Sequence, residues 1–153
     1  MIGRKYLKWI LFLSILGVAL SAYLVDVHYS QDAKVCDINP QFSCSGVSQN
    51  ENADFFGIPI AVLGLFGYAF LLLLAIINFN SHKLKKILFK KIFSPDVLMA
   101  FSLFALLISL YLTYIEFFVI KLICVVCLVS QVDIIIITYF SHKYRKLRIK
   151  HEQ

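Results

Sequence analysis

The chain has 153 residues, of which 60% are hydrophobic and only 16% are charged, and its formal net charge is +6. An average soluble domain is closer to half apolar and a quarter charged, and a domain this short leaves much of its surface in water. The composition therefore argues against a soluble enzyme, a disordered chain and a nucleic-acid-binding domain. It favours a small membrane protein that is almost entirely helical.

Four apolar stretches have the length of membrane-spanning helices, which need about 20 apolar residues each. We place them at 7–25, 56–79, 97–116 and 122–140. Helices are expected because a helix satisfies its own backbone hydrogen bonds in lipid. This predicts a single all-α membrane domain over 1–153, with an outer loop at 26–55, a cytoplasmic loop at 80–96 and a cytoplasmic tail at 141–153. Residues 19–22 resemble a signal-peptide cleavage site, but the apolar run continues beyond them, so we expect the first span to be retained.

Basic residues predict the orientation of these spans. All lysines and arginines except Lys34 and Lys121 lie before or at the very start of the first span, between the second and third, or after the fourth. The positive-inside rule then places both termini and the middle loop in the cytoplasm. The net positive charge is explained by this orientation and by contact with anionic lipid headgroups, without nucleic-acid binding.

All four cysteines consequently fall on the outer side. Cys36 and Cys44 lie in the outer loop, and Cys124 and Cys127 form a Cys-x-x-Cys motif at the start of the fourth span. Disulfides form and persist outside the cytoplasm. Four cysteines allow three pairings. The sequence favours Cys36 with Cys44 and Cys124 with Cys127, without deciding the matter.

The position of the Cys-x-x-Cys motif suggests redox chemistry. Unpaired N–H groups and the helix dipole stabilise a thiolate at a helix start, and thiolates drive disulfide exchange. Cys127, one turn deeper, would face the bundle interior, where a lipid-soluble oxidant such as a quinone can reach it. The loop pair would meet a water-soluble partner and pass electrons inward by thiol–disulfide exchange.

Further motifs accompany the two cysteine pairs. In chain order they are Cys36-x7-Cys44-Ser45-x-Val47, Phe56-Gly57-Ile58-Pro59-Ile60-Ala61-Val62-Leu63-Gly64, Tyr111-Leu112-Thr113-Tyr114 and Cys124-Val125-Val126-Cys127. With these motifs, nearly the whole chain resembles the vitamin K epoxide reductase (VKOR) family in its bacterial and archaeal branch. The resemblance implies a four-helix bundle around a quinone, ubiquinone or menaquinone, with a short half-helix in the first outer loop.

The resemblance also implies a role for each cysteine. Cys36 would exchange with a thioredoxin-fold partner, Cys44 would attack Cys124, and Cys127 would pass electrons to the quinone. The net reaction would be oxidation of a periplasmic or extracytoplasmic DsbA-like protein at the inner (cytoplasmic) membrane, in support of disulfide bond formation. Since the chain ends soon after the fourth span, we expect this partner to be a separate protein.

The expected quinone contacts are Cys127, Gln131, Phe56 and Val47. Gln131 stands where vertebrate members have a tyrosine, four residues beyond the inner cysteine, and its amide can still donate a hydrogen bond to a quinone carbonyl. Asn50 stands at the place of a family serine or threonine beyond the second loop cysteine, and Ser48 is nearby. These departures leave epoxide reduction and the identity of the quinone open.

Three alternative functions are compatible with parts of the sequence. A DsbB-type quinone reductase uses the same chemistry, but its Cys-x-x-Cys belongs to the first outer segment, whereas here it belongs to the second. A non-enzymatic four-span protein could carry static disulfides, and four thiolates could bind zinc.

Two acidic residues lie within the predicted spans. Glu116 is interpreted as a solvated residue at the membrane interface, with proton handling as the alternative. Asp133 is either functional, as ionisable residues in a membrane often are, or a buried acceptor between helices.

Overall fold

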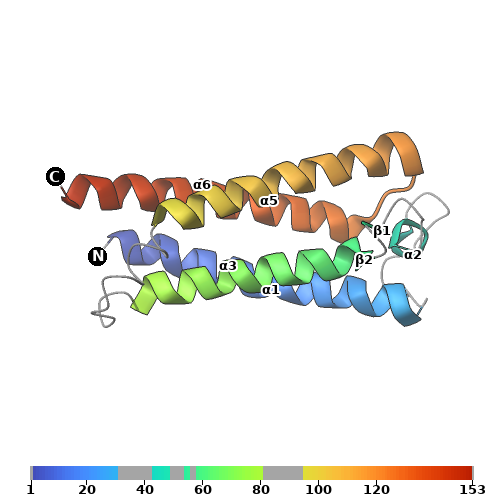
Figure 1. Cartoon of the computed structure of the whole chain (residues 1–153), viewed down its shortest axis with the longest axis horizontal. Coiled ribbons are helices and arrows are strands. Elements are labelled where there is room, and N and C mark those ends of the chain that lie inside the picture. The colour runs from blue at the N-terminus through green and yellow to red at the C-terminus, as the bar shows by residue number, and fades with distance from the viewer. Residues whose placement is uncertain (1, 31–42, 49–53, 56–57, 81–94, 153) are drawn as a thin grey trace.

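The computed structural model describes residues 2–30, 43–48, 54–55, 58–80 and 95–152. Its long helices form an elongated bundle: α1 (Ile2–Ser30), α3 (Ile60–Asn80), α5 (Pro95–Ile115) and α6 (Val125–Glu152) (Figure 1). Among the described residues, four helices are long and apolar enough to cross a membrane. Both chain termini lie at one end of the bundle, and the short helix α2 (Cys44–Ser48) lies at the other. The predicted all-α four-span bundle with a short helix in its first outer loop is confirmed.

The helix limits follow local sequence rules. Helix α5 begins at Pro95, where proline is tolerated because the first N–H groups of a helix have no partner within it, and Asp96 lies in its first turn, where an acid suits the helix dipole. A π-helical turn, η2 (Glu116–Ile120), continues α5 and ends at Lys121, whose φ of 58° is left-handed. Helix α6 extends beyond the predicted span, through the basic residues of the tail to Glu152.

A small antiparallel strand pair leads into α3 and was not predicted. Strands β1 (Asp54–Phe55) and β2 (Ile58–Pro59) place Asp54 opposite Pro59 and Phe55 opposite Ile58. Because β2 ends where α3 begins, the pair sets the point at which the chain enters the second span.

The four long helices do not pack equally against one another. Helix α1 packs against both α3 and α6, and α5 packs mainly against α6, while α3 and α5 touch less. A hydrophobic core fills the half of the bundle nearer the termini, around Leu7, Leu74 and Ile137. The outward faces remain apolar, with Phe104, for example, 59% exposed. An apolar exterior of this extent is expected of a surface that meets lipid.

Candidate active site

The Cys-x-x-Cys motif lies at the start of α6. Cys124 directly precedes the helix, and its Sγ accepts a hydrogen bond from the backbone N–H of Cys127 at 3.2 Å, while its carbonyl accepts one from Leu128 at 3.1 Å. Cys124 therefore occupies the N-cap position, where a side-chain acceptor satisfies an otherwise unpaired N–H. Cys124 and Cys127 form a disulfide with their Cα atoms 5.2 Å apart, within the normal range for such a bond. The structure thus joins the pair that the sequence favoured.

Cys44 from the outer loop lies against this disulfide. It is the first residue of α2 and is fully buried, together with Val27 from α1 and Cys124. The Cys44 Sγ is 3.2 Å from the Cys124 Sγ, and none of the described cysteines is a free thiol. A sulfur contact this short, shielded from water, is a suitable starting arrangement for exchange between the two pairs.

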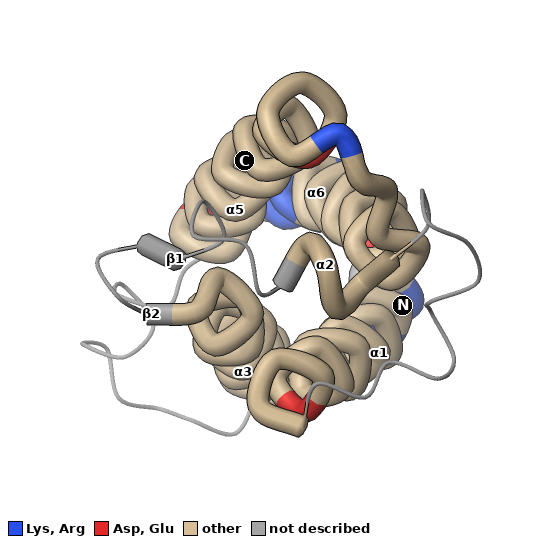
Figure 2. Tube along the Cα trace, turned by 90° about the vertical axis from the view of Figure 1, so that its right-hand side faces the viewer, with Lys and Arg blue, Asp and Glu red and all other residues tan. Residues whose placement is uncertain are grey.

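Helix α2 lies across the middle of the four long helices at the end of the bundle away from the termini, as Figures 1 and 2 show. Ser43 caps it: its Oγ accepts a hydrogen bond from the Gly46 N–H at 3.0 Å, and its carbonyl accepts one from the Val47 N–H at 3.3 Å. A Cβ on Gly46 would come within 2.8 Å of the Leu122 side chain. The absence of a side chain at this position therefore lets α2 approach the segment that leads into α6, and this brings Cys44 to Cys124.

Replacing Ser43 by alanine is expected to slow transfer from Cys44 to Cys124 several-fold. The change removes the cap oxygen, which costs about 1 kcal/mol of helix stability, so α2 spends less time in the conformation that presents Cys44. The measurement is the rate at which reduced Cys44 exchanges with the Cys124–Cys127 disulfide, followed by rapid acid quench and mass spectrometry. Ser43→Asn, which keeps a cap oxygen, should retain the wild-type rate, and an unchanged rate in Ser43→Ala would exclude this positioning role.

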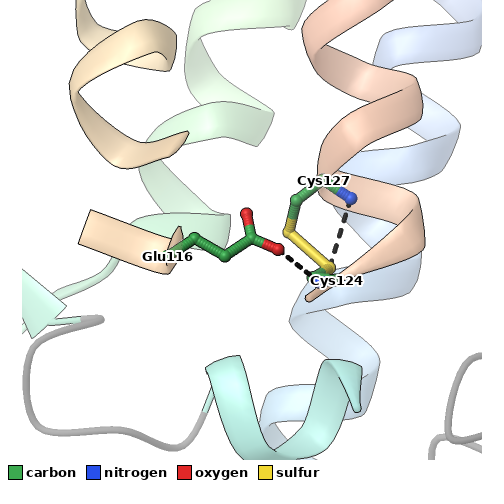
Figure 3. A group of neighbouring side chains, drawn as sticks. All are labelled: Glu116, Cys124 and Cys127. Atoms are coloured by element: carbon green, nitrogen blue, oxygen red, sulfur yellow. Dashed lines mark hydrogen bonds between the residues drawn. A yellow bond between two sulfur atoms is a disulfide. The ribbon is translucent and has the colours of Figure 1, made fainter. Parts of the chain in front are cut away.

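Glu116 lies beside the disulfide, with a carboxylate oxygen within 4.8 Å of both sulfur atoms. Its carboxylate accepts a hydrogen bond from the backbone N–H of Cys124, and Figure 3 shows the side chain extending from the end of the third span toward the cysteine pair. Glu116 is only 4% exposed. The interpretation of Glu116 as a solvated interfacial residue is therefore wrong, because the π-helical turn directs it into the protein.

A cavity of about 470 Å³ reaches the disulfide from within the bundle. Residues of all four long helices line it, with most of them from α3 and α5, the two helices that touch least. The lining is mainly apolar, and its polar groups include the hydroxyls of Ser109, Thr113 and Ser130. Both Cys127 and Glu116 border it. The disulfide therefore lies between the buried Cys44 and an apolar cavity within the membrane-spanning part.

Only some of the predicted quinone contacts line this cavity. Cys127 and Val47 line it, whereas the described lining residues do not include Gln131. Gln131 is buried behind the wall, where its Oε1 accepts hydrogen bonds from the hydroxyls of Ser109 and Thr113. Phe56 lies outside the described residues, as do Cys36 and Asn50.

Two contacts at the site join residues whose proximity the sequence does not reveal. Glu116 is separated from Cys124 by eight positions, and only the turn between the third and fourth spans brings the two together. The Tyr68 hydroxyl lies 2.9 Å from both the carbonyl and the hydroxyl oxygens of Ser130, which joins α3 to α6 across the cavity wall. Asp133 does not line the cavity. It is buried, and neither of its carboxylate oxygens has a hydrogen-bond partner among the described residues.

Comparison with known proteins identifies the family. The sequence model of the vitamin K epoxide reductase family matches residues 8–142, a range that contains all four cysteines. A search of curated proteins found no match. The chain therefore belongs to the vitamin K epoxide reductase family, and it is a membrane thiol–disulfide oxidoreductase.

Proposed function

We propose that the protein oxidises a thioredoxin-fold protein outside the cytoplasm and passes the electrons through its two cysteine pairs to a membrane quinone. One observation carries this proposal: the Cys124 Sγ lies 3.2 Å from the Cys44 Sγ, while its disulfide partner Cys127 borders the apolar cavity. One sulfur of the disulfide is thus accessible to the loop cysteine, and the other is accessible to a lipid-soluble molecule.

The exchange proceeds by successive thiolate attacks. Two thiols of the partner reduce the loop disulfide Cys36–Cys44 and leave the partner oxidised. The Cys44 thiolate then attacks the Cys124 Sγ, the Cys124–Cys127 bond breaks, and Cys127 leaves as a thiolate that carries the electron pair. Attack of the Cys36 thiolate on Cys44 restores the loop disulfide and releases Cys124 as a second thiolate. The two protons given up by the partner's thiols are balanced when the Cys124 and Cys127 thiolates take up two protons and become thiols. Two electrons have then moved from the partner to the helix pair.

The cavity fits a quinone in size and chemistry. Its volume of about 470 Å³ is typical of small-molecule sites, which are mostly apolar with a few well-placed polar groups. The hydroxyls of Ser109 and Thr113 donate to the Gln131 Oε1, so at the cavity wall they can still accept hydrogen bonds, as from the hydroxyls of a bound hydroquinone. Val47 adds an apolar contact. Phe56 stays a predicted contact. A bound ubiquinone or menaquinone would accept two electrons and two protons.

We further propose that the protein spans the inner membrane with both termini in the cytoplasm. The basic residues Arg4, Lys5 and Lys8 begin α1, and Lys143 and Arg145 lie in the last turns of α6, which end beside the N-terminus (Figure 1). Basic residues favour the cytoplasmic side. The cysteines lie at the opposite end of the bundle, which would place the exchange site on the periplasmic or extracytoplasmic face.

Filling the cavity tests the quinone proposal. Ala105 lines the cavity and Leu107, on the same helix, is 59% exposed and does not line it. Ala105→Phe is expected to raise the KM for quinone about tenfold or more, because the new ring occupies the site, while exchange between the cysteine pairs keeps its rate. Leu107→Phe, the matched control, should change neither quantity. The measurement is quinone reduction by proteoliposomes supplied with a reduced thioredoxin-fold protein.

The rival functions give different results in thiol titrations of purified protein with and without added quinone. Static disulfides would show no quinone-dependent change, and a thiolate metal site would bring stoichiometric zinc. Either result would contradict the proposal, as would an Ala105→Phe variant that reduces quinone with an unchanged KM.

A further inference from the structure

Glu116 is the buried carboxyl next to the disulfide, and it has no role in the exchange steps between the four cysteines. Its carboxylate oxygen and the sulfur atoms of Cys124 and Cys127 all lie within 4.8 Å of one another. It accepts a hydrogen bond from the Cys124 N–H and also borders the cavity. It lies on a π-helical turn. This conformation is rare in proteins overall, but where it occurs it is often at a functional site.

The hydrogen bond to the Cys124 backbone does not by itself explain a glutamate. A neutral side-chain oxygen would accept that bond equally well, whereas burying a carboxyl group is costly. Ionisable residues in membrane segments are rare and usually serve function. The proposed reaction, on which this inference rests, moves two protons as well as two electrons between thiols and the cavity. A carboxyl that borders both Cys124 and the cavity is suited to carry one of them.

We propose that Glu116 is the proton acceptor for the Cys124 thiol when the Cys124–Cys127 disulfide re-forms. The Cys124 S–H bond breaks, its proton passes to the Glu116 carboxylate, and the Cys124 sulfur bonds to Cys127. The electron pair leaves to the quinone through Cys127. Glu116 then releases its proton into the cavity, and the Cys127 thiol supplies the second proton there, so two thiols and a quinone become a disulfide and a hydroquinone.

Other titratable groups lie near the site, and their effects on the pH dependence must be distinguished from that of Glu116. His28 from α1 and Tyr68 from α3 border the same cavity, Cys44 from α2 contacts Cys124, and the exposed Lys121 ends the π-helical turn. Glu116 is the only carboxyl among the described residues that line the cavity. It is also the group that hydrogen bonds to the Cys124 N–H.

The test uses Glu116→Gln, because the amide oxygen keeps the hydrogen bond to Cys124 but cannot take up a proton. Both loop cysteines are replaced by serine, so that only the helix pair reacts, and the quinone is removed. The reduced pair is then reoxidised with diamide, a small two-electron thiol oxidant, and the rate is measured against pH. We expect Glu116→Gln to be about 100-fold slower than Glu116 at neutral pH, a loss usual for removal of a general base. The two rates should converge at alkaline pH, where the thiol ionises unaided, and Glu116→Asp should restore part of the rate.

The other outcomes overturn the proposal. A uniform slowing at all pH values would mean that Glu116 only shapes the site, and a faster rate in Glu116→Gln would mean that its charge merely opposes the thiolate. The same pH-dependent loss in His28→Gln, without one in Glu116→Gln, would assign the proton to the histidine. The control is Asp133→Asn, which makes the corresponding carboxyl-to-amide change at a buried residue of α6 that does not line the cavity, and it should have no effect. Because diamide replaces the quinone, failure here is distinct from failure of the quinone proposal.

Discussion

Replacing Cys127 by serine is expected to leave Cys44 and Cys124 joined by a disulfide and to lower quinone reduction by about 10³-fold or more. In this variant Cys124 loses its partner and becomes a thiolate 3.2 Å from the Cys44 Sγ. A disulfide needs about 2.05 Å between its sulfur atoms, so the two must approach by only about 1 Å. The Cys124 thiolate attacks Cys44, and the sulfur bound to Cys44 leaves as a thiolate. Peptide mapping under non-reducing conditions measures the new bond.

The matched control is Cys124→Ser, which removes the acceptor and should leave Cys127 without a bond to Cys44. Adding Cys44→Ser to the Cys127→Ser variant should abolish the crosslink. Recovery of quinone reduction at the normal rate in Cys127→Ser, or absence of the Cys44–Cys124 bond, would contradict the proposed electron route.

Replacing Gly17 by alanine is expected to destabilise the protein strongly for so small a change. A Cβ at this position would overlap the ring of Tyr68, so α1 and α3 must separate or the ring must leave its place. Overpacking of this kind costs about 1–3 kcal/mol, which outweighs the gain of up to about 1 kcal/mol from replacing a helical glycine by alanine. Displacing Tyr68 also breaks its contact with Ser130 and deforms the cavity wall. Thermal unfolding in detergent micelles gives the stability, and the KM for quinone reports on the cavity.

Gly67→Ala is the control for helix propensity, because a Cβ there meets nothing within 4 Å, and it should unfold at the same or a slightly higher temperature. Tyr68→Leu in the Gly17→Ala background should recover part of the lost stability, since the ring is the obstacle. Equal stability of Gly17→Ala and the wild type would show that the helices separate without cost.

Hydropathy and spacing were sufficient to predict the architecture. Long apolar stretches must form helices in lipid because no other local structure satisfies their backbone groups, so the four-span bundle followed from the sequence. The Cys-x-x-Cys motif marked the start of the last helix for an equally local reason. Cys124 precedes α6 and its sulfur caps it, which depends on residues only three positions apart.

Contacts between distant segments could not be predicted in this way. The sequence left the pairing of four cysteines open, and only the position of α2 brings Cys44 to Cys124 across 80 positions of chain. Gln131 was expected to contact the quinone directly, and the fold places Ser109 and Thr113 between it and the cavity side. Hydropathy cannot tell which face of an apolar helix is turned toward a cavity and which toward lipid.

The sequence by itself determined a small helical membrane protein, and it predicted that both cysteine pairs lie on one side of the bilayer, because composition, helix length and charge distribution are local properties. The tertiary structure alone decided which sulfur lies beside which, where α3 and α5 leave a cavity, and that Glu116 faces the disulfide rather than water. These features depend on how side chains of separate helices pack, and a close approach such as that of Tyr68 to Gly17 has no signature along the chain.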